Sequence, residues 1–273
     1  DLATETFTEY TNLRWAEAES ELKQKLRSMM WGMDYSPDGA IWYTDEASDS
    51  IWRFSIPDET YNRIDFPITE DISSLPQKLL IDGSNVIVND FTGGKLTIFG
   101  YSQLGELSYA AIPSPLDGFT SDFAIDSEDN IWYTNWSTYT DYENPAGILI
   151  KFGRTSWESQ LSISPETDSL LLQDFVQFFQ FPSGMTTPNG IAVGPNQNIW
   201  IVDTTSSYFF SFDPVTEEFT KYVTSVPTID SYGNASGLIK SPISRPYWIE
   251  PSGDNLVMNE QTANRIGVFN PST

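Results

Sequence analysis

The chain has 273 residues, of which 39% are hydrophobic and 14% aromatic, enough for a packed core and too apolar for a disordered chain. Its 38 acidic residues outnumber 14 basic ones, and the formal net charge of −24 disfavours binding to nucleic acid. The chain has neither cysteine nor histidine, which excludes thiolate chemistry, disulfides and imidazole bases or metal ligands. Any bound metal would therefore be a hard cation such as Ca²⁺ or Mg²⁺, held by oxygen atoms.

Targeting signals in the sequence are few. No run approaches the ~18 apolar residues of a membrane helix, so we expect no membrane span. The first residue is Asp1, which indicates a chain processed or excised from a longer product. Two glycosylation sequons begin at Asn135 and Asn234. Together with the acidic surface they favour an extracellular or cell-surface location, with an acidic cytosolic protein as the alternative.

The first predicted element after the N-terminal residues 1–11 is a helix. Residues 12–31 carry apolar side chains at helical spacing, which predicts a short amphipathic helix inserted before the rest of the fold. These apolar side chains are Trp15, Leu22, Leu26 and Met29.

From residue 32 onward a short sequence motif (the recurring phrase) is repeated. It consists of a polar turn followed by an apolar and aromatic strand that ends on an acid or amide. Its first clear copy reads Asp-Gly-Ala-Ile-Trp-Tyr-Thr-Asp at 38–45. The other copies lie at 82–90, 128–135, 196–203 and 252–260. A unit of this kind cannot bury its apolar face alone, so it must stack on its neighbours. We expect the tryptophans at one shared position to pack between repeats; they are Trp42, Trp132 and Trp200.

Each full repeat contains several strands. The best copy predicts four short strands joined by tight turns, at 189–193, 199–202, 208–212 and 219–222. Four-stranded units repeated in series are typical of the blades of a β-propeller. The predicted fold is therefore all-β, a single propeller domain over 1–273 with blades in 32–273. We detect five repeats, and a degenerate blade within 136–174 would bring the count to six or more.

The last repeat offers only three predicted strands before the chain stops. Residues 6–10, Thr-Phe-Thr-Glu-Tyr, match the outer strand Phe-Thr-Lys-Tyr at 219–222. The sequence therefore predicts that residues 1–11 supply the last outer strand and close the ring, which would remove an open sheet edge. The alternative is a chain cut from a longer array of blades.

The repeat resembles a known family. Gly-Ile-Ala-Val at 190–193, Ile-Trp-Tyr-Thr at 41–44 and Phe-Asp-Pro-Val-Thr at 212–216 are similar to motifs of the streptogramin B (virginiamycin B) lyase-like propellers and of the broader NHL-repeat class. The resemblance implies a propeller over 32–273, in an archaeal or bacterial surface protein. It also implies lyase chemistry with Mg²⁺ and a histidine base. Since this chain has no histidine, no catalytic histidine can be carried over.

Acidic residues form two candidate groups. The last position of the recurring phrase is acidic in four copies, where carboxylates on one ring could hold a Ca²⁺ or Mg²⁺ ion or could each cap a turn. These candidate metal ligands are Asp45, Asp90, Asp203 and Glu260. A second group near the first strands could serve carboxylate catalysis, with Asp34 and Asp122 facing the channel and Asp82 and Asp126 in turns. This group is Asp34, Asp82, Asp122, Asp126 and Glu250.

Aromatic residues in the insertions form a candidate partner-binding surface, with local packing as the alternative. They are Trp15, Trp136, Tyr139, Tyr142 and Trp157. The absence of histidine and cysteine favours a non-catalytic extracellular propeller that binds a protein or glycan, in a cell-surface assembly. The alternative is a carboxylate-dependent enzyme, a glycan hydrolase or diverged lyase, with a divalent cation at the channel mouth.

Overall fold

The computed structural model describes residues 4, 6–10, 30–66, 74–101, 107–112, 118–136, 147–153, 176–225 and 243–273. Within these ranges the chain forms five antiparallel sheets, four with four strands and one with three. The first sheet contains β1 (Met33–Ser36), β2 (Ala40–Asp45), the 3-10 turn η1 (Glu46–Ser48), β3 (Ser50–Ser55) and β4 (Thr60–Asp65). The second sheet contains β5 (Pro76–Asp82), β6 (Asn85–Asp90), β7 (Lys95–Tyr101) and β8 (Leu107–Ile112).

The other three sheets follow in chain order. The third contains β9 (Phe123–Ile125), β10 (Ile131–Trp136), β11 (Gly147–Phe152) and β12 (Val176–Gln180). The fourth contains β13 (Pro188–Val193), β14 (Ile199–Asp203), β15 (Tyr208–Asp213) and β16 (Glu218–Val223). The fifth contains β17 (Pro246–Ser252), β18 (Asn255–Glu260) and β19 (Arg265–Phe269). In every sheet, strands adjacent in sequence are adjacent in space.

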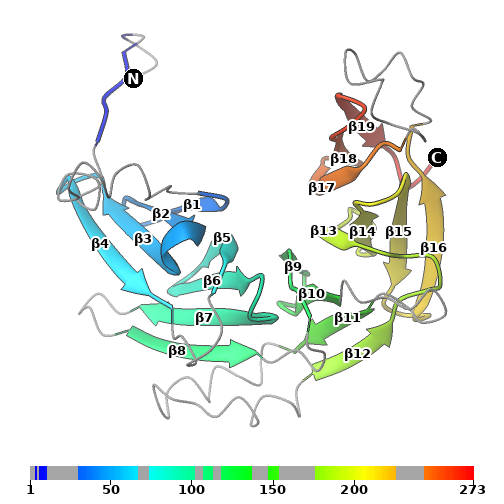
Figure 1. The fold of residues 1–273 in the computed structure, drawn as a ribbon, viewed down its shortest axis with the longest axis horizontal. Helices are drawn as coiled ribbons and strands as arrows, with labels where there is room; N and C mark the ends of the chain where they lie inside the picture. The colour runs from blue at the N-terminus through cyan, green and yellow to red at the C-terminus, as the bar shows by residue number, and fades with distance from the viewer. Residues whose placement is uncertain are drawn as a thin grey trace.

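The five sheets stand in an arc around a common centre (Figure 1). The first strands of the sheets lie innermost and the last strands lie on the rim. This arrangement confirms the predicted all-β, propeller-like architecture of four-stranded units. A count above five is not confirmed, and the helix predicted at 12–31 lies almost wholly outside the described residues. No helix in the described ranges is long and apolar enough to span a membrane.

Four hydrophobic clusters hold successive sheets together. Each cluster draws buried side chains from two neighbouring sheets, such as Trp132 and Leu149 from the third and Ile201 from the fourth. The prediction for the shared tryptophan position is confirmed, because Trp42, Trp132 and Trp200 are each 0–1% exposed and face the following sheet. Burying such side chains contributes about 1.5–3 kcal/mol apiece.

Each of these tryptophans also has a polar partner at the turn before its strand. The indole N–H groups donate to Ser36, the last residue of β1, and to Asp126 and Asn196, in the turns that precede β10 and β14. A buried indole N–H without an acceptor would cost about 1–3 kcal/mol. The turn residue and the tryptophan of one repeat therefore act as a pair.

Hydrogen bonds also cross each interface near the centre. Side chains at the ends of the second strands donate to backbone carbonyls of the next sheet's inner strand or the residues that lead into it. The four contacts are Thr44 to Gln77, Asn89 to Thr120, Thr134 to Pro188 and Thr204 to Pro246, at 2.7–3.0 Å. They set the spacing of the inner strands around the centre.

The predicted N-terminal closing strand is not confirmed. Residues 6–10 form no strand, and they lie by the first sheet, across the opening of the arc from β19 (Figure 1). The Tyr61 hydroxyl donates to the Tyr10 carbonyl, and the Tyr10 and Phe54 rings are 4.9 Å apart. These contacts hold the segment on β3 and β4, and the fifth sheet has three strands within the described ranges.

Candidate functional site

The centre of the arc is lined by equivalent positions of the inner strands. In three sheets the inner strand starts with proline and has a register shift over the next three residues, beginning at Pro76, Pro188 and Pro246. The shift places the second residue after each proline at one level of the ring. This level holds Gly32, Lys78, Asp122, Gly190 and Trp248.

The two glycines at this level allow neighbouring inner strands to approach each other. A Cβ on Gly32 would lie 2.4 Å from the Gln77 carbonyl oxygen, and one on Gly190 would lie 2.6 Å from that of Tyr247. Any side chain there would push adjacent sheets apart. The polar side chains of the level therefore come from the second and third sheets.

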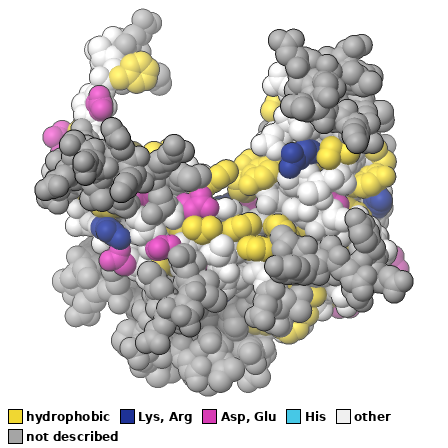
Figure 2. Space-filling view, in the orientation of Figure 1, with side chains coloured by type: hydrophobic (Ala, Val, Ile, Leu, Met, Phe, Trp, Pro, Cys, Tyr) yellow, Lys and Arg dark blue, Asp and Glu magenta, His cyan; other side chains and the backbone are white. Residues whose placement is uncertain are grey.

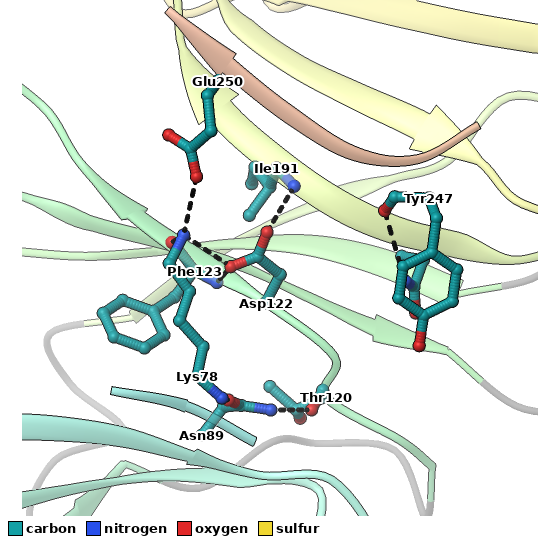
Figure 3. Close-up of polar contacts among 9 residues, drawn as sticks. Lys78, Asn89, Thr120, Asp122, Phe123, Ile191, Tyr247 and Glu250 are labelled. Carbon is teal, nitrogen blue, oxygen red and sulfur yellow. Dashed lines mark hydrogen bonds and ion pairs between the residues drawn. The ribbon is translucent and has the colours of Figure 1, made fainter. Parts of the chain in front are cut away.

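Lys78 and Asp122 form an ion pair at the centre (Figure 3). The Lys78 Nζ lies 2.7 Å from Oδ1 of Asp122 and donates to the Phe123 carbonyl at 2.9 Å. Asp122 is fully buried and also accepts the backbone N–H groups of Phe123 and Ile191, at 2.7 and 3.0 Å. The pair thus joins the second, third and fourth sheets, and three donors occupy the Asp122 carboxylate.

Glu250 on β17 completes the central cluster from the fifth sheet. Its Oε1 lies 3.8 Å from the Lys78 Nζ, and its side chain is 65% exposed. Burial acts to lower the pKa of Lys78, but Asp122 and Glu250 outweigh burial and raise it above its ordinary value. Lys78 is therefore a cation between two acids rather than a neutral nucleophile.

The two acids of the cluster differ in their surroundings. Burial raises the pKa of Asp122, opposed by Lys78 and by the two backbone N–H groups. Burial also raises the pKa of Glu250, with Lys78 lowering it and Asp122 raising it further. Since Asp122 is occupied and Glu250 is largely exposed, Glu250 is the carboxyl of this cluster that a ligand could reach.

An aromatic pair lies one residue before this level. The Trp31 and Tyr247 rings are stacked, with centroids 6.5 Å apart and planes inclined by 25°. Trp31 precedes β1 and is 43% exposed, and its indole N–H donates to Glu46. Burial raises the pKa of Tyr247, so its hydroxyl stays protonated. The pair joins the first sheet to the fifth, which are the two ends of the arc. Figure 2 shows hydrophobic side chains along the concave side of the molecule between the two ends of the arc.

The predicted metal ligands do not converge. Each accepts hydrogen bonds from loop residues: Asp45 from Ser48, Asp90 from Ser74, Leu75 and Gly93, Asp203 from Thr186 and Thr187, and Glu260 from Ser225, which follows β16 of the fourth sheet. All four are at most 2% exposed. Within the described ranges no three acidic side chains gather closely enough to hold a metal ion. Asp45 and Asp90 thus cap the turns that follow them, whereas Glu260 joins the fifth sheet to Ser225 at the end of the fourth. Binding of Ca²⁺ or Mg²⁺ stays a prediction.

The predicted partner-binding residues fall into two groups. Trp136 ends β10 and is only 6% exposed, with its indole N–H donating to Ser121 and its ring against Phe91 and Phe119. It is a packing residue rather than an exposed loop aromatic. The other predicted members lie outside the described residues: Trp15, Tyr139, Tyr142 and Trp157.

Of the two predicted glycosylation sites, Asn234 lies outside the described residues. Asn135 is fully buried, and its Nδ2 faces the Phe119 carbonyl at 3.4 Å. A glycan on this nitrogen would require the end of β10 to open.

The acids of the second predicted group lie in different surroundings, as was predicted for Asp122 and Asp126. Asp126 is a turn residue that accepts from Trp132 and Asn130, and Asp122 faces the centre. Asp34 accepts the Ile81 N–H of the second sheet at 2.7 Å. Sequence reasoning missed Lys78, Trp31 and Tyr247. Lys78 had a signal: it is a basic residue at an inner-strand position where the other repeats carry Gly, Trp or the acidic Asp122.

Comparison with known proteins places the chain among β-propellers. It is similar in fold to the virginiamycin B lyase of Staphylococcus aureus, with a TM-score of 0.62 and 17% identity over 88% of this chain and 66% of the lyase chain. A streptogramin B lyase structure gives a TM-score of 0.64 and 16% identity over 90% of this chain and 66% of the other. The resemblance to lyase-like propellers is thus confirmed at the level of fold.

Other solved propellers with different roles match as well. The extracellular domain of a two component system from B. thetaiotaomicron matches with a TM-score of 0.56 and 10% identity, over 88% of this chain and 27% of that one. No protein-family model matches the sequence, and no curated protein does. The chain spans about two thirds of the length of the solved lyases, 66% in both cases.

Proposed function

We propose that this protein is a non-catalytic β-propeller that binds a protein or glycan partner outside the cell, as part of a cell-surface assembly. The observation that carries the proposal is the stacked pair of Trp31 and Tyr247 at the centre of the arc, with Glu46 beside it and Glu250 on the same inner strand as Tyr247. Aromatic rings beside carboxylates can stack on sugar rings or on cationic side chains while the acids accept hydrogen bonds.

The way the buried acids are used supports a binding role over a catalytic one. The repeat acids are occupied by turn donors, and Asp122 is occupied by Lys78 and two backbone N–H groups. A general base needs a carboxylate that can reach the proton it takes. Glu250 has that access, but the second carboxyl of a hydrolase pair would have to come from another residue.

The net charge of −24 indicates the chemistry of the partner. A protein partner would present basic side chains to such a surface, and its association would weaken as salt screens the charges. A glycan partner would be neutral or basic. The location outside the cell is supported by the acidic composition and by the extracellular propeller domain among the solved neighbours.

The test is calorimetric titration of the chain with a panel of neutral oligosaccharides and a panel of basic peptides. We expect one of the two classes to bind, and Trp31→Ala to weaken that binding at least about tenfold, or about 1.4 kcal/mol. The control is Met30→Ala, which changes an adjacent apolar side chain that is 64% exposed. Failure of both panels to bind, or equal losses in the two variants, would contradict the proposal.

The alternative is a carboxylate-dependent enzyme, a glycan hydrolase or diverged lyase with a divalent cation at the channel mouth. The raised pKa and the exposure of Glu250 favour it, because both suit a proton donor. Turnover of a glycan panel and of a streptogramin B, with and without added Mg²⁺, is the measurement. Turnover that Glu250→Gln abolishes would support the enzyme, and its absence under all conditions would leave the binding module.

A further inference from the structure

The outer edge of the fifth sheet differs from that of every other sheet. In the first four sheets the third strand is paired on both sides, whereas among the described residues β19 pairs only with β18. An unpaired strand edge offers a row of N–H and C=O groups that can accept another strand. β19 contains no proline that would interrupt such pairing.

The side chains of β19 are also uncovered. Ile266 and Val268 are each 67% exposed, although they are β-branched and apolar. Their counterparts in the fourth sheet are Phe209 and Ser211, which are 2% and 4% exposed. Among the described residues, the fifth sheet therefore has no fourth strand at its edge and no sheet packed on its open face.

The missing strand has a matching sequence elsewhere in the chain. Phe7, Thr8 and Tyr10 repeat the pattern of Phe219, Thr220 and Tyr222 in β16. In β16, Phe219 lies opposite Phe212 and Tyr222 lies opposite Phe209, with ring centroids 4.7 and 5.2 Å apart.

The register of β16 on β15 can be applied to residues 6–10 on β19. It would place Phe7 opposite Phe269, Thr8 opposite Val268 and Tyr10 opposite Ile266. Phe269 is an aromatic residue at the position that Phe212 holds in the fourth sheet, and both are followed by a turn with proline. Pairing of residues 6–10 with β19 would therefore repeat the aromatic pair that Phe219 makes with Phe212 in the fourth sheet.

Within one chain, residues 6–10 (the donor segment) do not lie on β19 (the acceptor edge). Tyr10 is held by Phe54 and Tyr61 of the first sheet, and the segment lies across the opening of the arc from β19 (Figure 1). Residues 6–10 are all exposed, and the Phe7 side chain is 103% exposed. A fully exposed phenylalanine on an extended segment is available to a neighbouring molecule.

We propose that residues 6–10 of one copy of the chain add as a fourth strand to β19 of a second copy. Each copy carries one donor and one acceptor, so a reciprocal pair satisfies both in a two-fold symmetric, strand-exchanged dimer. The inference goes beyond the proposed binding function and is independent of the central site. Since each copy carries a net charge of −24, pairing brings like charges together and should be stronger at 0.15 M than at about 0.01 M salt.

Disulfide trapping tests the pairing directly, because the chain has no cysteine of its own. A mixture of the single variants Thr8→Cys and Val268→Cys, made with tags of different mass, is oxidised and resolved without reducing agent. Directly opposite residues of paired strands have Cβ atoms within about 5.5 Å, which permits a disulfide after small adjustment. We expect the mixed dimer to be the main cross-linked species.

The control pairs Thr8→Cys with Val215→Cys, a position in the turn between β15 and β16 that is 90% exposed. Equal cross-linking in the control and test mixtures would overturn the proposal. So would a double variant, Thr8→Cys with Val268→Cys, that gives only an internally cross-linked monomer, because that result means closure within one chain.

Light scattering provides a second measurement on the unmodified chain. The expected mass is twice that of the 30.8 kDa chain. Phe7→Asp should reduce it to the monomer value, whereas Val215→Asp should leave it unchanged. A monomer mass for the unmodified chain at 0.15 M salt, from dilute solution up to the highest soluble concentration, would also overturn the proposal.

Discussion

The fourth and fifth sheets contain similar third strands in different surroundings. β15 reads Tyr-Phe-Phe-Ser-Phe-Asp before a proline turn and is buried along most of its length. β19 reads Arg-Ile-Gly-Val-Phe, also before a proline turn, and is mostly exposed. β15 is covered by β16 at its edge and by the fifth sheet on its face. The comparison shows that burial in this fold comes from neighbouring repeats rather than from the strand itself.

The tryptophan position shows the same contrast. Where a following sheet exists, the position holds Trp42, Ile87, Trp132 or Trp200, each buried against it. In the fifth sheet the position holds Val257, which is only partly buried. A large aromatic side chain is therefore used where a following sheet covers it.

Replacing the tryptophan between the third and fourth sheets should give the largest effect. Trp132→Ala removes a fully buried side chain that packs on Phe179 and Phe212 and leaves Asp126 without its indole donor. We expect the free energy of unfolding, measured in urea, to fall by about 3–5 kcal/mol. Val257→Ala, at the equivalent position of the fifth sheet, should cost about 1 kcal/mol or less. Similar losses would mean that the open face of the fifth sheet is covered in solution.

The central ion pair should rank second. Lys78→Met leaves the buried Asp122 carboxylate without its cation, and we expect a loss of about 3 kcal/mol. Glu250→Gln removes the other, exposed partner of Lys78 and should cost about 0–1 kcal/mol. Chemical denaturation of both variants measures the difference. If Glu250→Gln cost as much as Lys78→Met, the central pair would not be the dominant contact.

A turn residue should give a smaller, pH-dependent effect. Burial alone would raise the pKa of Asp126, but hydrogen bonds from Trp132 and Asn130 outweigh burial and lower it. Its stabilisation is therefore fully present above the ordinary value near 3.8 and is lost as the pH falls through the lowered value.

The variant Asp126→Asn checks this sign. We expect it to cost about 1–2 kcal/mol at neutral pH, with the gap to the unmodified chain closing as the pH falls below about 3.8. The measurement is urea unfolding at a series of pH values. A gap that widened in acid would mean that the carboxyl is protonated in the native state.

The smallest effect should come from the exposed strand. Ile266→Thr changes a side chain that is 67% exposed and should alter the free energy of unfolding by no more than about 0.5 kcal/mol in dilute solution. Phe209→Ala, at the matching position of β15, should cost about 3–5 kcal/mol. A loss above about 1 kcal/mol for Ile266→Thr would show that β19 is covered even at low concentration.

Much of the fold could be predicted because its signals are local. The turn-and-strand phrase, its period and the shared tryptophan position predicted the sheets, their order and the packing of Trp42, Trp132 and Trp200, as observed. The turn-capping interpretation corresponds to the structure for Asp45 and Asp90, because their donors Ser48 and Gly93 lie only three residues later in the sequence.

The central site could not be predicted in the same way. Lys78 and Asp122 lie in different sheets, and Glu250 lies in a third, so no spacing in the sequence brings them together. Trp31 and Tyr247 come from opposite ends of the chain. Trp136 was expected on a loop surface, yet β10 extends to include it, and its ring packs on Phe91 and Phe119.

By itself the sequence determined the repeating unit, in which apolar strands alternate with polar turns. It also determined the residues that bond each turn to its tryptophan. These choices depend on hydrogen bonds and side-chain direction within a few residues. Only the tertiary structure decided which faces are covered, which charges meet at the centre and where residues 6–10 lie, because these depend on contacts between distant sheets. Similar third strands are therefore buried in β15 and mostly exposed in β19.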